Sequence, residues 1–171
     1  MADEVARGYL ITLGAKRAPN EMWRTALSQV SISRRFEWDS AHRIAGHEGA
    51  CKAIHGHRYA AEFEITAPST DSLGRVVDFG EFKSVVGAWI LNNFDHTAVF
   101  DRDDQDPAVE AVIALNERMG KPVYRLAGPP TAERLVVELA QAIGPLLAAR
   151  GLELVRIRLW ETPNCAALWS A

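Results

Sequence analysis

Two kinds of side chain alternate along the stretch SISRRFEWDSAH, residues 31–42. The more apolar face takes every second residue, namely Ile32, Arg34, Phe36, Trp38 and Ser40. The residues between them form a more polar face. Because successive side chains of a β-strand point to opposite sides, this period of two predicts a strand with one face toward a core. The fold is therefore expected to contain a sheet.

Other stretches carry strand or helix signals of their own. Further strands are expected at residues 55–67, within residues 69–82 and at residues 153–162. Apolar residues recur at helical spacing in residues 81–94 and 131–150, which predicts two amphipathic helices. Thr131 stands where a helix N-cap would, with Glu133 in the first turn. Strands that can pair antiparallel, together with two helices, predict an α+β domain.

Composition excludes several classes of protein. With 171 residues the chain is long enough for one domain with a hydrophobic core, and its formal charge of −3 gives no electrostatic footprint for nucleic acid. No apolar run is long enough to span a membrane, and no basic amphipathic run suggests a membrane surface. The two cysteines are too few for a disulfide framework, and the N-terminal residues do not resemble a secretory signal. A cytoplasmic location is therefore predicted.

Domain organisation divides at residue 31. Residues 1–30 are predicted to be an N-terminal extension of unclear structure, in which residues 9–14 suit a short strand and residues 20–30 a short helix. Residues 31–171 are predicted to form a single domain.

Three histidines form the main candidate metal site. His55 and His57 are separated by one glycine in a predicted strand, so both imidazoles point to the same side. His42, at the end of the preceding strand, could supply a third nitrogen. Three imidazoles with one open position are typical of catalytic zinc, with Zn–N distances of about 2.0–2.1 Å. Histidine pairs also occur on ordinary polar sheet faces, so the spacing alone leaves both interpretations open.

Cys51 stands four residues before His55 in a glycine-containing loop. A free cysteine is often only a small buried hydrophobe. A polar loop beside a cation, however, favours the thiolate. Cys51 would then be either a fourth metal ligand or a catalytic thiolate, and the spacing does not decide between them.

Two acidic positions are further candidates. Asp95 and His96 follow the first predicted helix, where a carboxylate could hold the imidazole in one tautomer for proton transfer. An exposed helix terminus would explain them equally well. Glu161, at the end of the last predicted strand, could accept paired hydrogen bonds from a ring amide and amino group. A surface charge is the simpler interpretation of that carboxylate.

Six motifs in order resemble one known family. They are FEWDSAHR, CKAIHGHRY, GRVVDFGEFK, FDHTAVF, PPTAERL and WETPNCAALW. Together they resemble the 6-pyruvoyl-tetrahydropterin synthase / 6-carboxytetrahydropterin synthase family, from about Ile32 to the C-terminus. The resemblance implies the tunnelling fold (T-fold), an antiparallel sheet with two helices packed on one face. It also implies a homo-oligomer, usually a hexamer of two trimers.

The resemblance also implies roles for the candidate residues. It implies that Zn²⁺ is bound by His42, His55 and His57. Cys51 would be the catalytic base rather than a ligand, and Asp95 with His96 a proton-relay pair that often serves a neighbouring subunit. Glu161 would anchor the pterin ring, and Thr131 lies in a segment that helps to hold it.

The three residues between Cys51 and His55 resemble the bacterial queuosine-pathway branch of the family. That branch converts 7,8-dihydroneopterin triphosphate to 6-carboxy-5,6,7,8-tetrahydropterin and releases acetaldehyde and triphosphate. One alternative is a 6-pyruvoyltetrahydropterin synthase, which eliminates triphosphate without loss of acetaldehyde. Another is a non-catalytic pterin-binding zinc protein, although binding alone needs neither a base nor a relay.

Overall fold

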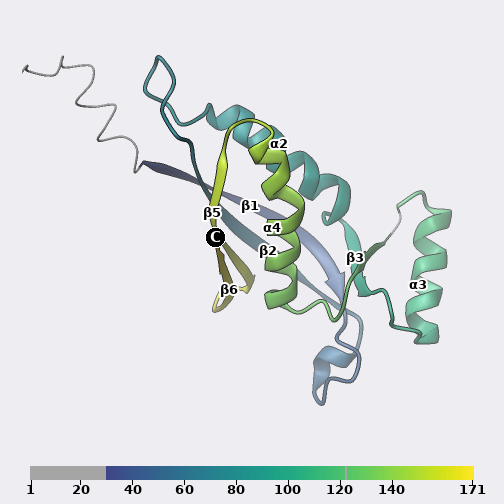
Figure 1. The fold of residues 1–171 in the computed structure, drawn as a ribbon. Coiled ribbons are helices and arrows are strands. Elements are labelled where there is room, and N and C mark those ends of the chain that lie inside the picture. The colour runs from purple at the N-terminus through teal and green to yellow at the C-terminus, as the bar shows by residue number, and fades with distance from the viewer. Residues whose placement is uncertain (1–29, 122) are drawn as a thin grey trace, which may run out of the picture.

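One six-stranded sheet organises the chain in the computed structural model, which describes residues 30–121 and 123–171 (Figure 1). The strand order across the sheet is β4-β3-β1-β2-β5-β6. The strands are β1 (Ser31–His42), β2 (His55–Thr66), β3 (Thr97–Asp101), β4 (Tyr124–Leu126), β5 (Glu153–Thr162) and β6 (Cys165–Ser170). The helices are the short 3₁₀ turn η2 (Ala50–Lys52), α2 (Phe79–Asn93), α3 (Pro107–Arg118) and α4 (Ala132–Ala148).

The centre of the sheet is antiparallel, as predicted. β1 and β2 pair over their whole length, from Ser31 opposite Thr66 to His42 opposite His55. β5 pairs antiparallel with β2, and β6 with β5. The strands predicted at residues 31–42, 55–67 and 153–162 are therefore confirmed.

The other edge of the sheet is parallel, which corrects the prediction of an antiparallel sheet. β2 ends beside the start of β1, and α2 then carries the chain back along the sheet. β3 consequently begins beside the end of β1, with Thr97 opposite Ser40, and runs in the same direction. β4 adds to β3, also parallel. The sheet is therefore mixed.

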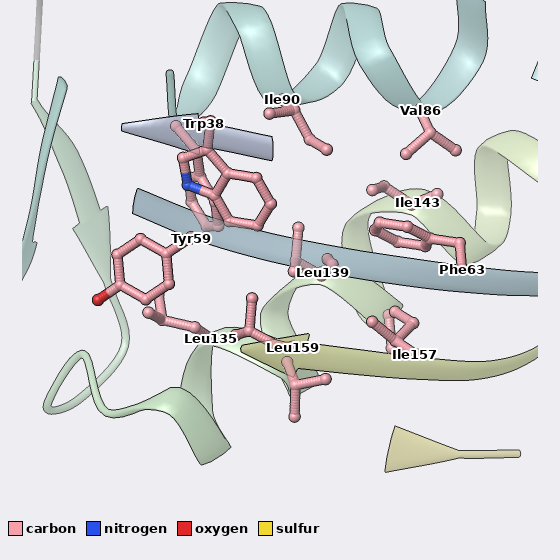
Figure 2. Close-up of a cluster of buried hydrophobic side chains, with 14 of the residues drawn as sticks. Trp38, Tyr59, Phe63, Val86, Ile90, Leu135, Leu139, Ile143, Ile157 and Leu159 are labelled. Carbon is pink, nitrogen blue, oxygen red and sulfur yellow. The ribbon is translucent and has the colours of Figure 1, made fainter. Parts of the chain in front are cut away.

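Helices α2 and α4 cover one face of the sheet and form the main core, as predicted (Figure 1). Figure 2 shows side chains of both helices meeting those of β1, β2 and β5, among them Trp38, Phe63 and Ile157. Their N-termini are capped by Asp78 and Thr131, whose side chains accept hydrogen bonds from backbone N–H groups of the first turn. The N-cap predicted at Thr131 is thus confirmed.

One local prediction is wrong, and one helix was not predicted. The strand expected within residues 69–82 is absent: this segment forms turns around Asp71 and then the start of α2. The long connection between residues 101 and 128 contains a third helix, α3, with Pro107 in its first turn and Asp106 as its N-cap. α3 lies on the β3–β4 side of the sheet (Figure 1).

α3 packs on the sheet face opposite α2 and α4. Val99 of β3 belongs to the main core, whereas its neighbours Ala98 and Phe100 form a second cluster with Val109 of α3. Because neighbouring residues of a strand point to opposite faces, the two clusters lie on the two sides of β3. Among the described residues no helix has the length and apolar character to cross a membrane. The strand predicted at residues 9–14 and the helix at 20–30 lie outside the described residues, except for Val30.

Candidate active site

The three candidate histidines meet at the end of the β1–β2 pair. His42 is directly opposite His55, and His57 is opposite Ser40, so all three rings project from the helix-covered face. Their ligand nitrogens lie within 4.8 Å of one another. The prediction that these histidines lie together is therefore confirmed. The group found among the described residues does not include Cys51.

Hydrogen bonds to the backbone set the tautomers of two of the rings. His42 Nδ1 lies 2.8 Å from the carbonyl oxygen of Pro130, and His55 Nδ1 lies 2.9 Å from that of Ala53. A carbonyl only accepts, so each Nδ1 is the protonated nitrogen and each Nε2 keeps its lone pair. The two Nε2 atoms face one another at 3.2 Å.

The two facing Nε2 atoms, each with a lone pair, are arranged to bind a cation between them. Two nitrogens bound to one tetrahedral zinc ion at ~2.0–2.1 Å lie about 3.3 Å apart, close to the observed separation. Without a cation, two facing lone pairs repel one another. A hydrogen bond from the other ring nitrogen to a carbonyl is also the usual second shell of metal-binding histidines. The geometry therefore suits a divalent metal ion held by His42, His55 and His57.

Burial reinforces the preference of His42 for the neutral state. The ring is almost fully enclosed, and this desolvation lowers the pKa of His42. The hydrogen bond to Pro130 acts in the opposite direction, as does the carboxylate of Glu161, whose Oε1 lies 3.6 Å from Nε2. A neutral imidazole is the form that binds metal.

Tyr59 stands directly behind this cluster. It occupies the next inward position of β2 after His57, and its hydroxyl lies 3.3 Å from His42 Nδ1. Figure 2 shows the ring at the end of the apolar core, with the hydroxyl directed away from the apolar side chains. Burial, followed by the negative charge of Glu161, raises the pKa of Tyr59, so the hydroxyl stays protonated. Tyr59 therefore connects the core to the metal-binding end of the sheet.

Three further predicted residues share one hollow beside the histidines. Cys51, Thr131 and Glu161 all line a pocket of about 350 Å³. They come from η2, the N-terminus of α4 and the end of β5, which are far apart in sequence. The predicted base and the predicted pterin-binding residues are therefore brought together. Cys165 lines the same hollow.

Asp95 and His96 form a pair, but in a different place. His96 Nδ1 lies 2.9 Å from Asp95 Oδ1, and the His96 side chain is 73% exposed. His96 lines a separate hollow of about 430 Å³ that also includes His57. Asp95 and His96 thus lie in contact within one chain, but the hollow that contains Cys51 does not include them.

The sequence comparison decides the family. The family model described as 6-pyruvoyl tetrahydropterin synthase matches residues 31–170. The chain belongs to this family. The match starts and ends almost where the sheet does, from β1 to β6.

Curated members of the 6-pyruvoyl tetrahydropterin synthase family match most of the chain. Proteins of Rickettsia felis and Rickettsia bellii are 38% and 39% identical over 137 residues, which is 80% of this chain and 96% of each relative. A Haemophilus influenzae protein is 32% identical and is covered over 93% of its length. All three are named 6-carboxy-5,6,7,8-tetrahydropterin synthase.

Solved structures show the same fold. An uncharacterised Wolinella succinogenes protein superposes with a TM-score of 0.66 at 18% identity, over 82% of this chain and 97% of that protein. The 6-pyruvoyl tetrahydropterin synthase of Plasmodium falciparum superposes with a TM-score of 0.61 at 17% identity, over 83% and 97%. The chain therefore has the α+β T-fold predicted from its motifs.

Sequence reasoning missed two polar residues beside the cluster. Tyr59 could have been found, because it continues the every-second-residue series of His55 and His57. Arg43 directly follows His42, and its Nη1 donates to Asp106 at 2.6 Å. No pattern near Arg43 indicates its partners, since they lie some sixty positions away.

Proposed function

We propose that the chain is a zinc-dependent carbon–oxygen lyase. Its reaction would convert 7,8-dihydroneopterin triphosphate to 6-carboxy-5,6,7,8-tetrahydropterin, with release of acetaldehyde and triphosphate, in queuosine (7-deazapurine) biosynthesis. The observation that carries the proposal is the convergence of three histidine nitrogens next to a hollow lined by Cys51, Thr131 and Glu161. The names of the curated relatives support the choice of product.

The metal is proposed to be Zn²⁺, held by His42, His55 and His57. When bound, zinc supplies Lewis-acid polarisation of the substrate's side-chain oxygens. The three imidazoles leave one coordination position open, as in catalytic rather than structural zinc sites. The facing Nε2 atoms of His42 and His55 support this assignment.

The hollow suggests how the chain's own groups would act on the substrate. Glu161 is proposed to accept hydrogen bonds from the ring amide and amino group of the pterin, with Thr131 holding the edge of the ring. Cys51, on the same hollow and outside the histidine group, is proposed to remove a proton from the substrate side chain as a thiolate. These groups would hold a substrate between the proposed anchor and the proposed base, and such positioning of reacting groups lowers the barrier of a reaction.

Asp95 and His96 are proposed to complete the site of a neighbouring subunit. Asp95 would hold the His96 ring in one orientation, while the exposed imidazole transfers protons. Their separation from the hollow of Cys51 supports this, because one copy alone does not enclose all the proposed groups. Assembly as a hexamer of two trimers and a cytoplasmic location stay predictions.

One incubation tests the proposal directly. The purified, zinc-loaded protein is mixed with 7,8-dihydroneopterin triphosphate, and the products are identified by mass spectrometry. Carboxytetrahydropterin with acetaldehyde supports the proposal. A pyruvoyl product would instead support a 6-pyruvoyltetrahydropterin synthase, the name carried by the family model. No turnover with any metal would instead support a non-catalytic pterin-binding protein. The metal-stripped protein serves as the control.

A further inference from the structure

The turn that presents Asp95 and His96 is held against strand β1. The backbone N–H of His96 donates to the carbonyl of Asp39 at 2.8 Å, and the backbone N–H of Asp39 donates to Asp95 Oδ1 at 3.3 Å. His96 has a φ of 55°, in the left-handed region that residues other than glycine rarely adopt. Such a conformation persists only when its surroundings hold it.

Ser40 supplies a contact on both sides of this turn. Its side chain points into the protein and the residue is only 6% exposed. The hydroxyl lies 3.0 Å from the carbonyl oxygen of Phe94 and 3.2 Å from that of Thr97. These two residues directly flank the Asp95–His96 pair. One hydroxyl proton, shared by two carbonyls, therefore closes the turn at its base.

The same strand carries a metal-site residue at a fixed distance. His42 follows Ser40 by two positions and points to the same face of β1, about 7 Å along the strand. β3 pairs with this part of β1, with Thr97 opposite Ser40 and Val99 opposite His42. The turn is therefore attached to this end of β1, and its position there sets where the His96 ring would be presented to a neighbouring copy.

We infer that Ser40 is a positioning residue that fixes the Asp95–His96 turn against β1. Its effect on catalysis rests on the proposed function, whereas its effect on the turn does not. Loss of the hydroxyl removes a donor that contacts both flanking carbonyls. The His96 ring is still present but no longer held in one position, which lowers turnover without changing how the substrate binds.

The test compares three variants with the wild-type, full-length, zinc-loaded protein. Ser40→Ala removes the hydroxyl, Ser40→Cys keeps the size but offers only a weak donor, and Ser40→Thr keeps the hydroxyl. Ser33→Ala is the matched control, because Ser33 lies on the exposed face of the same strand. We measure kcat, KM and zinc content, and hydrogen exchange by mass spectrometry in peptides that span residues 94–98.

Ser40→Ala is expected to lower kcat about 10- to 100-fold, the scale of a small misplacement, with KM and zinc content unchanged. Exchange within residues 94–98 is expected to accelerate, while peptides from the core of β2 stay protected. Ser40→Cys should behave similarly, and Ser40→Thr should recover most of the loss. If Ser40→Ala fails to fold, kcat and hydrogen exchange of Ser40→Cys test the inference in its place.

Two results separate this inference from the proposed function. If the wild-type protein has no turnover, the proposed function fails, but faster exchange in residues 94–98 of the Ser40 variants still supports the inference. Equal exchange in residues 94–98 and equal kcat in Ser40→Ala, Ser40→Cys and Ser33→Ala would overturn it. A loss of zinc in step with kcat would also overturn it, because Ser40 would then act on the metal site instead.

Discussion

The two groups of candidate residues differ in how the fold holds them. The histidine cluster is partly enclosed: His42 is almost fully buried, His55 and His57 are half-buried, and hydrogen bonds to backbone carbonyls select the tautomers of His42 and His55. The Asp95–His96 pair is built on the surface, with the His96 side chain 73% exposed. Its support comes from the backbone and from one buried hydroxyl beneath it.

This difference separates two tasks. A group that holds an ion needs fixed lone pairs, so its ring nitrogens are committed to partners within the same chain. A group that passes protons to another molecule needs an accessible ring nitrogen. The exposed ring of His96 is therefore suited to a site completed from outside this chain, whereas the three histidines of the cluster all come from one chain. The following experiments test this contrast, from the largest expected effect to the smallest.

Replacement of one ligand should affect both metal and activity. His55→Ala removes one of the two nitrogens that face each other at 3.2 Å. We expect zinc content to fall close to zero and turnover to fall with it, by at least about 10³-fold, because the site loses its Lewis acid. Metal analysis and steady-state kinetics measure the two effects. His47→Ala removes a histidine outside the metal-binding group and should keep its zinc, so it is the matched control for metal content. A zinc-replete His55→Ala protein would contradict the assignment.

Replacement of the proposed base should separate metal from activity. Cys51→Ala is expected to retain zinc and to lose turnover by about 10²–10⁴-fold, the contribution of a positioned base. Zinc content and kcat again provide the measurement. Cys165→Ala, which removes the other thiol of the same hollow, is the control and should retain turnover. Loss of zinc from Cys51→Ala would make that thiol a ligand after all.

Mixed oligomers test whether the two regions serve one chain or two. Cys51→Ala and His96→Ala are each expected to be nearly inactive alone. If His96 completes the site of a neighbouring copy, subunits exchanged between the two variants should regain roughly a quarter of wild-type activity, since about that share of sites then has both groups. Activity is measured before and after co-refolding. No recovery would place both groups in the same chain's site.

Removal of the Tyr59 hydroxyl should have a smaller effect. Tyr59→Phe keeps the ring in the core but removes the oxygen that lies 3.3 Å from His42 Nδ1. We expect zinc affinity to fall by about 10-fold, at the low end of second-shell effects. Competition with a chelator measures the change. Tyr124→Phe, which removes a hydroxyl remote from the cluster, should leave the affinity unchanged.

The pH dependence of the metal-free protein should show the smallest effect. Burial lowers the pKa of His42. The imidazole is therefore protonated at a lower pH in the folded protein than in the unfolded chain, where a histidine titrates near pH 6.5. Stability from this residue is complete above about pH 6.5 and is lost as the pH falls toward the folded pKa. Thermal unfolding between pH 7 and pH 5 measures this slope. In His42→Gln, stability should fall less steeply between pH 7 and pH 5 than in the wild type. An equal decrease in the two proteins would contradict the interpretation.

The sequence predicted the long elements well and the short ones poorly. The bounds of β1 and β5 match those predicted, because twelve and ten residues provide several repeats of the strand pattern. β3, β4 and β6 are too short for such repeats. Parallel pairing of β3 with β1 depends on the path of α2 through space, which no local pattern encodes.

The same contrast applies to the site. The three histidines were accessible to sequence reasoning because strand periodicity places His55 and His57 on one face. The separation of His96 from Cys51 was not accessible, since it depends on which hollow each loop reaches. Ser40 was placed correctly on the inner face of β1, but its partners are more than fifty positions away. Long-range hydrogen bonds of this kind leave no trace in a sequence pattern.

The ion pairs of Arg43 have an evolutionary consequence. Arg43 directly follows His42. Its Nε lies 3.0 Å from Oδ2 of the buried Asp104, and its Nη1 lies 2.6 Å from Oδ2 of Asp106, the N-cap of α3. The hydrogen bond from Arg43 is also the main cause that lowers the pKa of Asp106, so this carboxylate stays charged. A change in the length or start of α3 would leave the largely buried guanidinium of Arg43, next to His42, without these two carboxylate partners. Substitutions that change the start of α3 and substitutions at Arg43 beside the histidine cluster are therefore expected to occur together during evolution.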